Sequence, residues 1–131
     1  MGRKWALRVL LDTHVVLWTL YRKEALGQAA IDVLALPQTR RVVSVASLWE
    51  IAIKRRLGRL DAPDDLPAYL SANRHEILPV AADHAWSVGR LPPIHGDPFD
   101  RLLVAQAQIE DVPLITHDRL LERYDIRVIR A

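Results

Sequence analysis

The sequence predicts an α/β fold in which a central parallel sheet is sandwiched between helices. Short apolar runs alternate with segments of helical periodicity along the chain, which is the pattern of successive strand–helix–strand units. Half of the 131 residues are hydrophobic, which is enough to build one core. The sequence carries neither an internal repeat nor a low-complexity linker. We therefore expect a single domain over residues 1–131.

The first half of the chain is expected to contribute two strands. Leu7–Leu11 is an apolar run broken by one arginine, typical of a buried parallel strand. Arg41–Val45 is rich in valine and predicts the next strand. Pro37 and Gly58 are expected to end two of the helices between and after these strands. The predicted helices are His14–Tyr21, Gly27–Leu36 and Ser47–Leu57.

The second half continues the same alternation. Leu91–Pro98 holds three prolines and a glycine and is expected to be a loop. Glu76–Val80, Pro113–Thr116 and Ile126–Ile129 are the predicted strands. The predicted helices are Asp64–Arg74, Ala81–Val88, the strongly amphipathic Phe99–Glu110 and a short one over Leu120–Tyr124. Three tryptophans fall in helical patterns and are expected in the core, namely Trp18, Trp49 and Trp86.

Composition narrows the function classes. The formal net charge is +2, a mild basic excess that is compatible with a nucleic-acid partner without requiring one. The absence of cysteine excludes disulfides and cysteine-type zinc sites, and it fits a reducing compartment. Asp12 and His14 interrupt the apolar run near the N-terminus, so neither a signal peptide nor a membrane span is expected there. We therefore expect a cytoplasmic protein without a membrane partner.

Four acidic residues fall where the predicted strands end or where the following helices begin. Asp12 follows the first strand, and Glu50 is expected in the first turn of the helix after the second strand. Asp100 opens the helix after the proline-rich loop, and Asp118 follows the strand that ends at Thr116. Ligands of such sheets bind beyond the carboxyl ends of the strands, so these carboxylates are expected to meet there. Asp97 is close enough in sequence to join them.

A cluster of carboxylates needs a cation to offset its mutual repulsion. Hard divalent ions such as Mg²⁺ and Mn²⁺ prefer oxygen ligands and suit such a set. An ion of this kind can activate a water and neutralise a leaving oxygen in phosphodiester hydrolysis. Thr13 and Thr116 are expected to hydrogen-bond the metal-binding carboxylates. Arg101 is expected to meet phosphate or a partner.

Ordinary helix capping explains some of the same residues. Ser47 and Glu50 have the spacing of a capping box, in which Glu50 only closes the helix start. Asp97 can be an N-cap, with Pro98 as the first helical residue and Asp100 in the first turn. Capping and metal binding are not exclusive, because a carboxylate oriented by one role remains available for the other.

Asp12 is harder to explain by capping alone, because a carboxylate in so apolar a segment must be paired or bind a metal. Asp118 can cap the short helix that follows it. Lys54 lies four residues after Glu50, the spacing of a helix-surface ion pair. The histidines beside the acidic positions are interpreted as loop residues, although they could touch phosphate: His14, His95 and His117.

Four segments, LLDTHVVLW, SLWEIAIK, DPFDRLLVAQA and LITHD, resemble the PIN-domain family, and more narrowly the VapC-type toxins of type II toxin–antitoxin systems. The resemblance covers nearly the whole chain in order. It implies a PIN-like single domain and Mg²⁺- or Mn²⁺-dependent cleavage of RNA. Where family members often have a phenylalanine a few residues after the fourth acid, RLL stands here. The four acids that the resemblance assigns are Asp12, Glu50, Asp100 and Asp118.

The resemblance also implies roles and partners. Asp12 and Asp100 would hold the principal metal with help from Glu50, while Asp118 would hold a second metal or orient the attacking water. Family members usually form homodimers, and a cognate antitoxin covers the site. The resemblance therefore implies an RNA substrate, an antitoxin protein and a second copy of the chain as partners.

Two other functions remain open at this point. A non-catalytic module on the same fold would bind RNA or protein, although retained carboxylates without a metal would repel one another. A phosphotransfer domain would also place an aspartate after its first strand. A receiver domain needs an acidic pair there, but Leu11 precedes Asp12, and a phosphatase of the HAD type needs a second aspartate where His14 stands.

Overall fold

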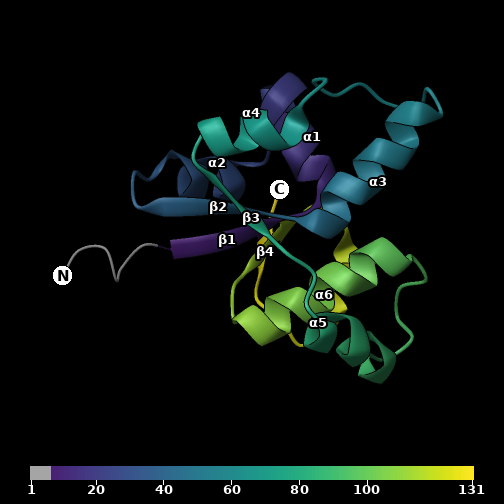
Figure 1. The fold of residues 1–131 in the computed structure, drawn as a ribbon. Coiled ribbons are helices and arrows are strands. Elements are labelled where there is room, and N and C mark those ends of the chain that lie inside the picture. The colour runs from purple at the N-terminus through teal and green to yellow at the C-terminus, as the bar shows by residue number, and fades with distance from the viewer. Residues whose placement is uncertain (1–6) are drawn as a thin grey trace.

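The computed structural model describes residues 7–131, which form a five-stranded parallel sheet with helices on both faces (Figure 1). The strand order is β3-β2-β1-β4-β5. A receiver domain would pair β1 with β3, whereas here β1 pairs with β2 and β4, so the receiver alternative is excluded. The predicted α/β fold is confirmed. The strands are β1 (Leu7–Leu11), β2 (Thr39–Ser44), β3 (His75–Leu78), β4 (Leu114–Thr116) and β5 (Val128–Arg130).

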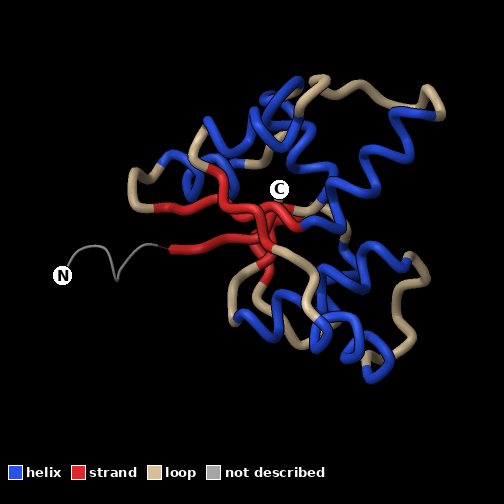
Figure 2. Tube along the Cα trace, in the orientation of Figure 1, coloured by secondary structure: helices blue, strands red, loops and turns tan. Residues whose placement is uncertain are grey.

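The helices lie in two layers. In Figure 1, α1, α2 and α4 lie above the sheet, and α5 and α6 lie below it; Figure 2 shows the strands between the two helical layers. Short 3₁₀ turns connect some of these elements: η2 (Lys23–Ala25), η3 (Val88–Arg90) and η4 (Arg119–Arg123). The α-helices are α1 (Thr13–Tyr21), α2 (Gln28–Ala35), α3 (Val45–Arg56), α4 (Leu66–Ala72), α5 (Ala82–Ser87) and α6 (Pro98–Glu110).

The two faces of the central strand β1 are buried in two separate cores. Val9 and Leu11 pack into the cluster beneath α1, α2, α3 and α4. Leu10, between them, points to the opposite face and packs with Leu103 of α6 and Leu114 of β4. This alternation is the period of a strand covered on both faces. Because β1 is buried on both sides, the residue at its carboxyl end, Asp12, is held in a rigid part of the molecule.

The boundaries of α3 differ from the prediction in an informative way. The helix begins at Val45, two residues earlier than expected, because the Ser44 hydroxyl accepts from the backbone N–H of Ala46 at 3.0 Å. Ser47 therefore lies inside the helix, and the predicted Ser47–Glu50 capping box is wrong. At the other end the prediction is confirmed: Gly58 adopts φ 73°, and its N–H donates to the carbonyl of Arg55 at 3.0 Å.

Other predicted elements also differ from the structure: β2 is Thr39–Ser44 instead of Arg41–Val45, and α4 is Leu66–Ala72 instead of Asp64–Arg74. The strand β3 ends at Leu78 instead of Val80, since Pro79 has no N–H to donate to a neighbouring strand. β5 begins at Val128 instead of Ile126, whose N–H donates to the carbonyl of Tyr124 at 2.9 Å in a turn. The short helix after Asp118 is a 3₁₀ turn.

Two of the three tryptophans predicted to lie in the core are on the surface. Trp49 is 60% exposed and Trp86 is 78% exposed, while Trp18 is partly buried. On α3 the buried side is formed by small and polar residues together with Ile51, which leaves Trp49 to pack edge-on against Phe99 with ring centroids 5.2 Å apart. Helical periodicity shows which residues share a face of a helix, but it does not show which face packs against the rest of the protein. Within residues 7–131, no helix has the length and apolar character needed to cross a membrane.

Candidate active site

Asp12 is a buried carboxylate at the carboxyl end of β1. Only 3% of the residue is exposed. One carboxylate oxygen accepts from the backbone N–H of Val15 at 2.8 Å, which makes Asp12 the N-cap of α1. The other accepts from the hydroxyl of Thr116 at the end of β4. Burial raises the pKa of Asp12, and these two hydrogen bonds partly oppose that effect because they favour the charged form.

Glu50 is the second buried carboxylate, and it is 4% exposed. It lies in the second turn of α3, one turn later than predicted, because the helix begins at Val45. Its Oε1 accepts from the hydroxyl of Thr13 at 2.6 Å, and its Oε2 accepts from Nζ of Lys54 at 2.8 Å. The predicted Glu50–Lys54 ion pair is confirmed. The glutamate is thus fixed from both sides, by α1 and by its own helix.

Asp100 lies where the negative charges converge. Burial raises its pKa to about 7, and the nearby charges of Asp97, Asp12 and Glu50 add to that rise, while His95 opposes it. A carboxyl group with a pKa of about 7 is half protonated at pH 7. Asp12 and Glu50 are therefore close enough to Asp100 to affect its ionisation.

His95 connects the third and fourth acids. Its Nε2 lies 2.8 Å from Oδ2 of Asp118 and 3.3 Å from Oδ2 of Asp100. Its Nδ1 accepts from the backbone N–H of Asp97 at 3.0 Å, so the ring proton of the neutral imidazole is on Nε2, facing the carboxylates. Sequence reasoning interpreted His95 as an ordinary loop histidine. Its nearness to Asp97 and Asp100 in the chain was a weak indication of a role in the site. Nothing in the sequence indicated its contact with Asp118, which is 23 residues away.

Two of the three predicted caps, Asp97 and Asp118, are present in the structure. Asp97 is the N-cap of α6, where its Oδ1 accepts from the N–H groups of Phe99 at 2.8 Å and Asp100 at 3.3 Å. Asp118 caps η4 by accepting from Leu120 N–H at 3.0 Å, and its own N–H donates to the Thr116 hydroxyl at 3.0 Å. Capping therefore orients these two carboxylates without removing them from the cluster.

The guanidinium of Arg101 is held by hydrogen bonds to its own chain. It donates to the carbonyl oxygens of Pro92 at 3.0 Å and Val88 at 3.1 Å. These bonds tie α6 to the loop that carries His95. In this arrangement Arg101 supports the loop, and its donors are directed at the backbone.

The donor set fits a hard divalent cation. Ligand atoms of His95, Asp100 and Asp118 lie within 4.8 Å of one another, and the two carboxylates among them suit a metal ion while His95 holds them together by hydrogen bonding. Asp12 and Glu50 add buried carboxylate oxygens close to Asp100. Like charges gathered in a partly buried site raise each other's pKa, and a bound cation removes that repulsion.

A model of the PIN domain matches residues 9–127. The chain belongs to the PIN domain family. This confirms the family that the sequence motifs indicated. A search of curated proteins found no match to this PIN domain.

Solved structures share the PIN domain's fold. It is similar to a chain of VapBC2 from Rickettsia felis bound to promoter DNA, with a TM-score of 0.71 and 17% identity over 95% of this chain and 99% of that one. It is similar to a chain of DNA-bound VapBC from Salmonella typhimurium, with a TM-score of 0.69 and 21% identity over 95% and 98%. It is also similar to a chain of FitAcB from Neisseria gonorrhoeae, with a TM-score of 0.62 and 17% identity over 92% of this chain and 96% of that one. At these identities the likeness extends to the fold alone.

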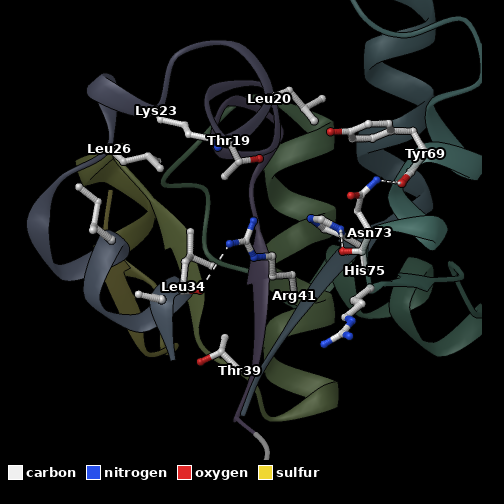
Figure 3. A pocket seen from close by; sticks show the side chains of 13 residues that line it. Thr19, Leu20, Lys23, Leu26, Leu34, Thr39, Arg41, Tyr69, Asn73 and His75 are labelled. Carbon is white, nitrogen blue, oxygen red and sulfur yellow. Dashed lines mark hydrogen bonds between the residues drawn. The ribbon is translucent and has the colours of Figure 1, made fainter. Parts of the chain in front are cut away.

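A separate hollow of about 610 Å³ lies at the opposite edge of the sheet of this PIN domain (Figure 3). Thr39 and His75, the first residues of β2 and β3, line it together with Lys23 and Arg41. Burial lowers the pKa of Arg41. None of the four predicted acids lines this hollow, so the hollow and the carboxylate cluster are different places.

Proposed function

We propose that this PIN domain is a Mg²⁺- or Mn²⁺-dependent endoribonuclease that hydrolyses RNA phosphodiester bonds. The observation that carries the proposal is the convergence of Asp12, Glu50 and Asp118 with Asp100, whose pKa is raised to about 7 by burial and by neighbouring carboxylates. Such a set is unfavourable without a cation and suited to one.

Asp12 and Asp100 hold the principal ion in this proposal, and Glu50 assists them. When bound, the ion activates water and neutralises negative charge on the leaving oxygen. The hydroxyl of Thr116 and the N–H of Val15 fix the Asp12 carboxylate. This support from neighbouring groups keeps the ligand oxygens in place before substrate arrives.

Asp118 orients the attacking water or contributes to a second ion. The Nε2–H of His95 holds its Oδ2, and the N–H of Leu120 holds its Oδ1. Attack of water on phosphorus expels the 3′ oxygen, which leaves a 5′-phosphate and a 3′-hydroxyl. Thr13 and Lys54 contribute by holding the Glu50 carboxylate in one orientation.

We further propose that the chain is the toxin of a toxin–antitoxin pair, acts in the cytoplasm, forms a homodimer and is blocked by a cognate antitoxin. The support is the shared fold with chains of the VapBC complexes from Rickettsia felis and Salmonella typhimurium and with a toxin–antitoxin complex from Klebsiella pneumoniae. Co-expression with the product of a neighbouring small gene, followed by affinity purification, tests this part. A stable complex that suppresses cleavage is expected, and unchanged cleavage would contradict it.

The test of the activity is cleavage of total RNA by the purified chain in Mg²⁺ or Mn²⁺. We expect cleavage that EDTA abolishes and that Asp12→Asn lowers by at least about a thousandfold, as removal of a principal ligand does. Asp32→Asn, which changes an exposed aspartate on α2, is the matched control and should cleave normally. Cleavage that persists in EDTA or in Asp12→Asn would overturn the proposal.

A further inference from the structure

Three aromatic side chains gather beside the candidate active site. The rings of His14 and His117 meet edge to face, with centroids 5.5 Å apart and planes at 77°. The ring of Trp18 lies 4.7 Å from that of His117, tilted by 48°. His14 and Trp18 are one turn apart on α1, whereas His117 comes from the loop after β4. We call these three residues the aromatic cluster.

The aromatic cluster lies on the same backbone segments as two of the acids. His14 is two residues after Asp12, in the first turn of the helix that Asp12 caps. His117 stands between Thr116, which donates to Asp12, and Asp118. Every backbone segment that carries the cluster therefore also carries a carboxylate of the site. His14 and His117 are both close enough to act electrostatically on Asp12, so the rings lie beside the carboxylates.

The cluster is open to solvent. His14 and His117 are both exposed, and Trp18 is partly buried, so the tryptophan fixes the cluster to α1 while the imidazoles face outward. Exposed aromatic rings next to a phosphate-cleaving site are suited to nucleobases, because every base has a flat π-face. In a duplex those faces are already stacked, whereas the bases of loops and single strands are free to leave the stack.

We propose that the aromatic cluster binds an unpaired nucleobase next to the bond that is cleaved. The inference rests on the proposed nuclease function for its substrate. It adds a binding site that the carboxylates do not provide, because they contact the RNA backbone and repel it in the absence of a cation. Stacking discriminates little between bases, so the site selects unpaired structure more than sequence.

Binding without turnover tests the proposal. The probe is a fluorescein-labelled single-stranded RNA of about 12 nucleotides, within the range that one binding domain covers, compared with the same strand carrying abasic residues. Fluorescence anisotropy in EDTA gives the dissociation constant of each. We expect the parent chain to bind the base-bearing strand about tenfold more tightly than the abasic strand, and a matching RNA duplex without that advantage.

Two double variants separate stacking from charge. His14→Ala with His117→Ala should lose the tenfold preference, while His14→Phe with His117→Phe should keep it because the rings remain. Trp86→Ala, which removes a more exposed aromatic ring on α5, is the matched control and should bind as the parent does. Thermal unfolding of each variant verifies that it is folded.

Several results would overturn the inference: equal binding of both strands by the parent, no detectable binding of the base-bearing strand, or a preference that survives in the alanine double variant. Because the assay contains no metal, it does not depend on catalysis. Metal-dependent cleavage together with equal binding of the two strands would defeat this inference and leave the nuclease proposal standing. Base-dependent binding without cleavage under any condition would defeat the nuclease proposal and leave the aromatic cluster as a base-binding site alone.

Discussion

At the scale of single residues, the main feature of the candidate site is its buried carboxylates. Asp12 and Glu50 are almost fully buried, and each accepts hydrogen bonds from two donors. A buried charge is tolerated only when such partners or a cation stabilise it. Asp12 could be singled out from the sequence because of its apolar neighbours, whereas the donors that hold it could not, since Thr116 is 104 residues away.

Asp100 gives a stability prediction with a definite sign. Its folded pKa of about 7 lies above the ordinary value of 3.8, so the stability linked to its protonated form is complete below pH 3.8 and is lost as the pH rises through 7. Asp100→Asn removes that loss. In EDTA, the variant should gain on the order of 1–3 kcal/mol in unfolding free energy over the parent at pH 8 relative to pH 5.

Urea unfolding at the two pH values measures this difference. Asp32→Asn, an exposed aspartate on α2, is the control and should show the same change as the parent. A gain for Asp100→Asn that is equal at pH 5 and pH 8 would mean that the carboxyl group titrates normally and that the charges do not converge on it.

His95 gives a prediction about activity. His95→Ala removes both the donor to Asp118 and the acceptor for Asp97 N–H, so we expect cleavage to fall by about 10–100-fold, as for other groups that orient metal ligands. Tyr124→Phe is the matched variant, because it removes only the hydroxyl that accepts from the His95 backbone N–H at 2.9 Å. Steady-state cleavage of one RNA by both variants measures the effect. If Tyr124→Phe loses as much activity as His95→Ala, the imidazole has no role of its own.

At the scale of elements, helix starts position the site. Asp12 begins α1, Asp97 begins α6 and Asp118 begins η4. The sequence predicted the Asp97 cap because aspartate followed by proline is typical of a helix start. It misplaced the start of α3, since Ser44 and Ser47 are both competent caps and only packing against α1 and β2 selects between them.

Substitutions of Asp97 can distinguish its role as a helix cap from the effect of its charge on Asp100. Asp97→Ala should cost about 1 kcal/mol in unfolding free energy, because the N–H groups of Phe99 and Asp100 lose their acceptor. Asp97→Asn should retain most of that stability, since the amide oxygen still accepts. Both changes should lower the pKa of Asp100, whose rise Asp97 partly causes.

Chemical denaturation measures the stability of both variants, and carboxyl NMR shifts follow the pKa of Asp100. A loss as large in Asp97→Asn as in Asp97→Ala would contradict the capping role. A pKa of Asp100 that is unchanged in both would show that the two carboxylates are farther apart than the structure has them.

At the scale of the whole molecule, the parallel sheet converts separate sequence motifs into one site. The alternation of strands and helices was sufficient to predict the sheet and the edge at which the acids meet. The strand order and the role of His95 were not predictable, because both depend on contacts between segments far apart in the chain. Trp49 and Trp86 were misplaced because periodicity does not show which helix face lacks a neighbour.

The measurement that tests the central claim most directly is anomalous diffraction from a crystal of the chain soaked in Mn²⁺ at pH 8. We expect an anomalous peak at bonding distance from the carboxylate oxygens of Asp12 and Asp100, and we expect Asp100→Asn to lose it. Well-ordered side chains with no such peak, or a peak that persists unchanged in Asp100→Asn, would contradict the claim that these carboxylates form a divalent-metal site.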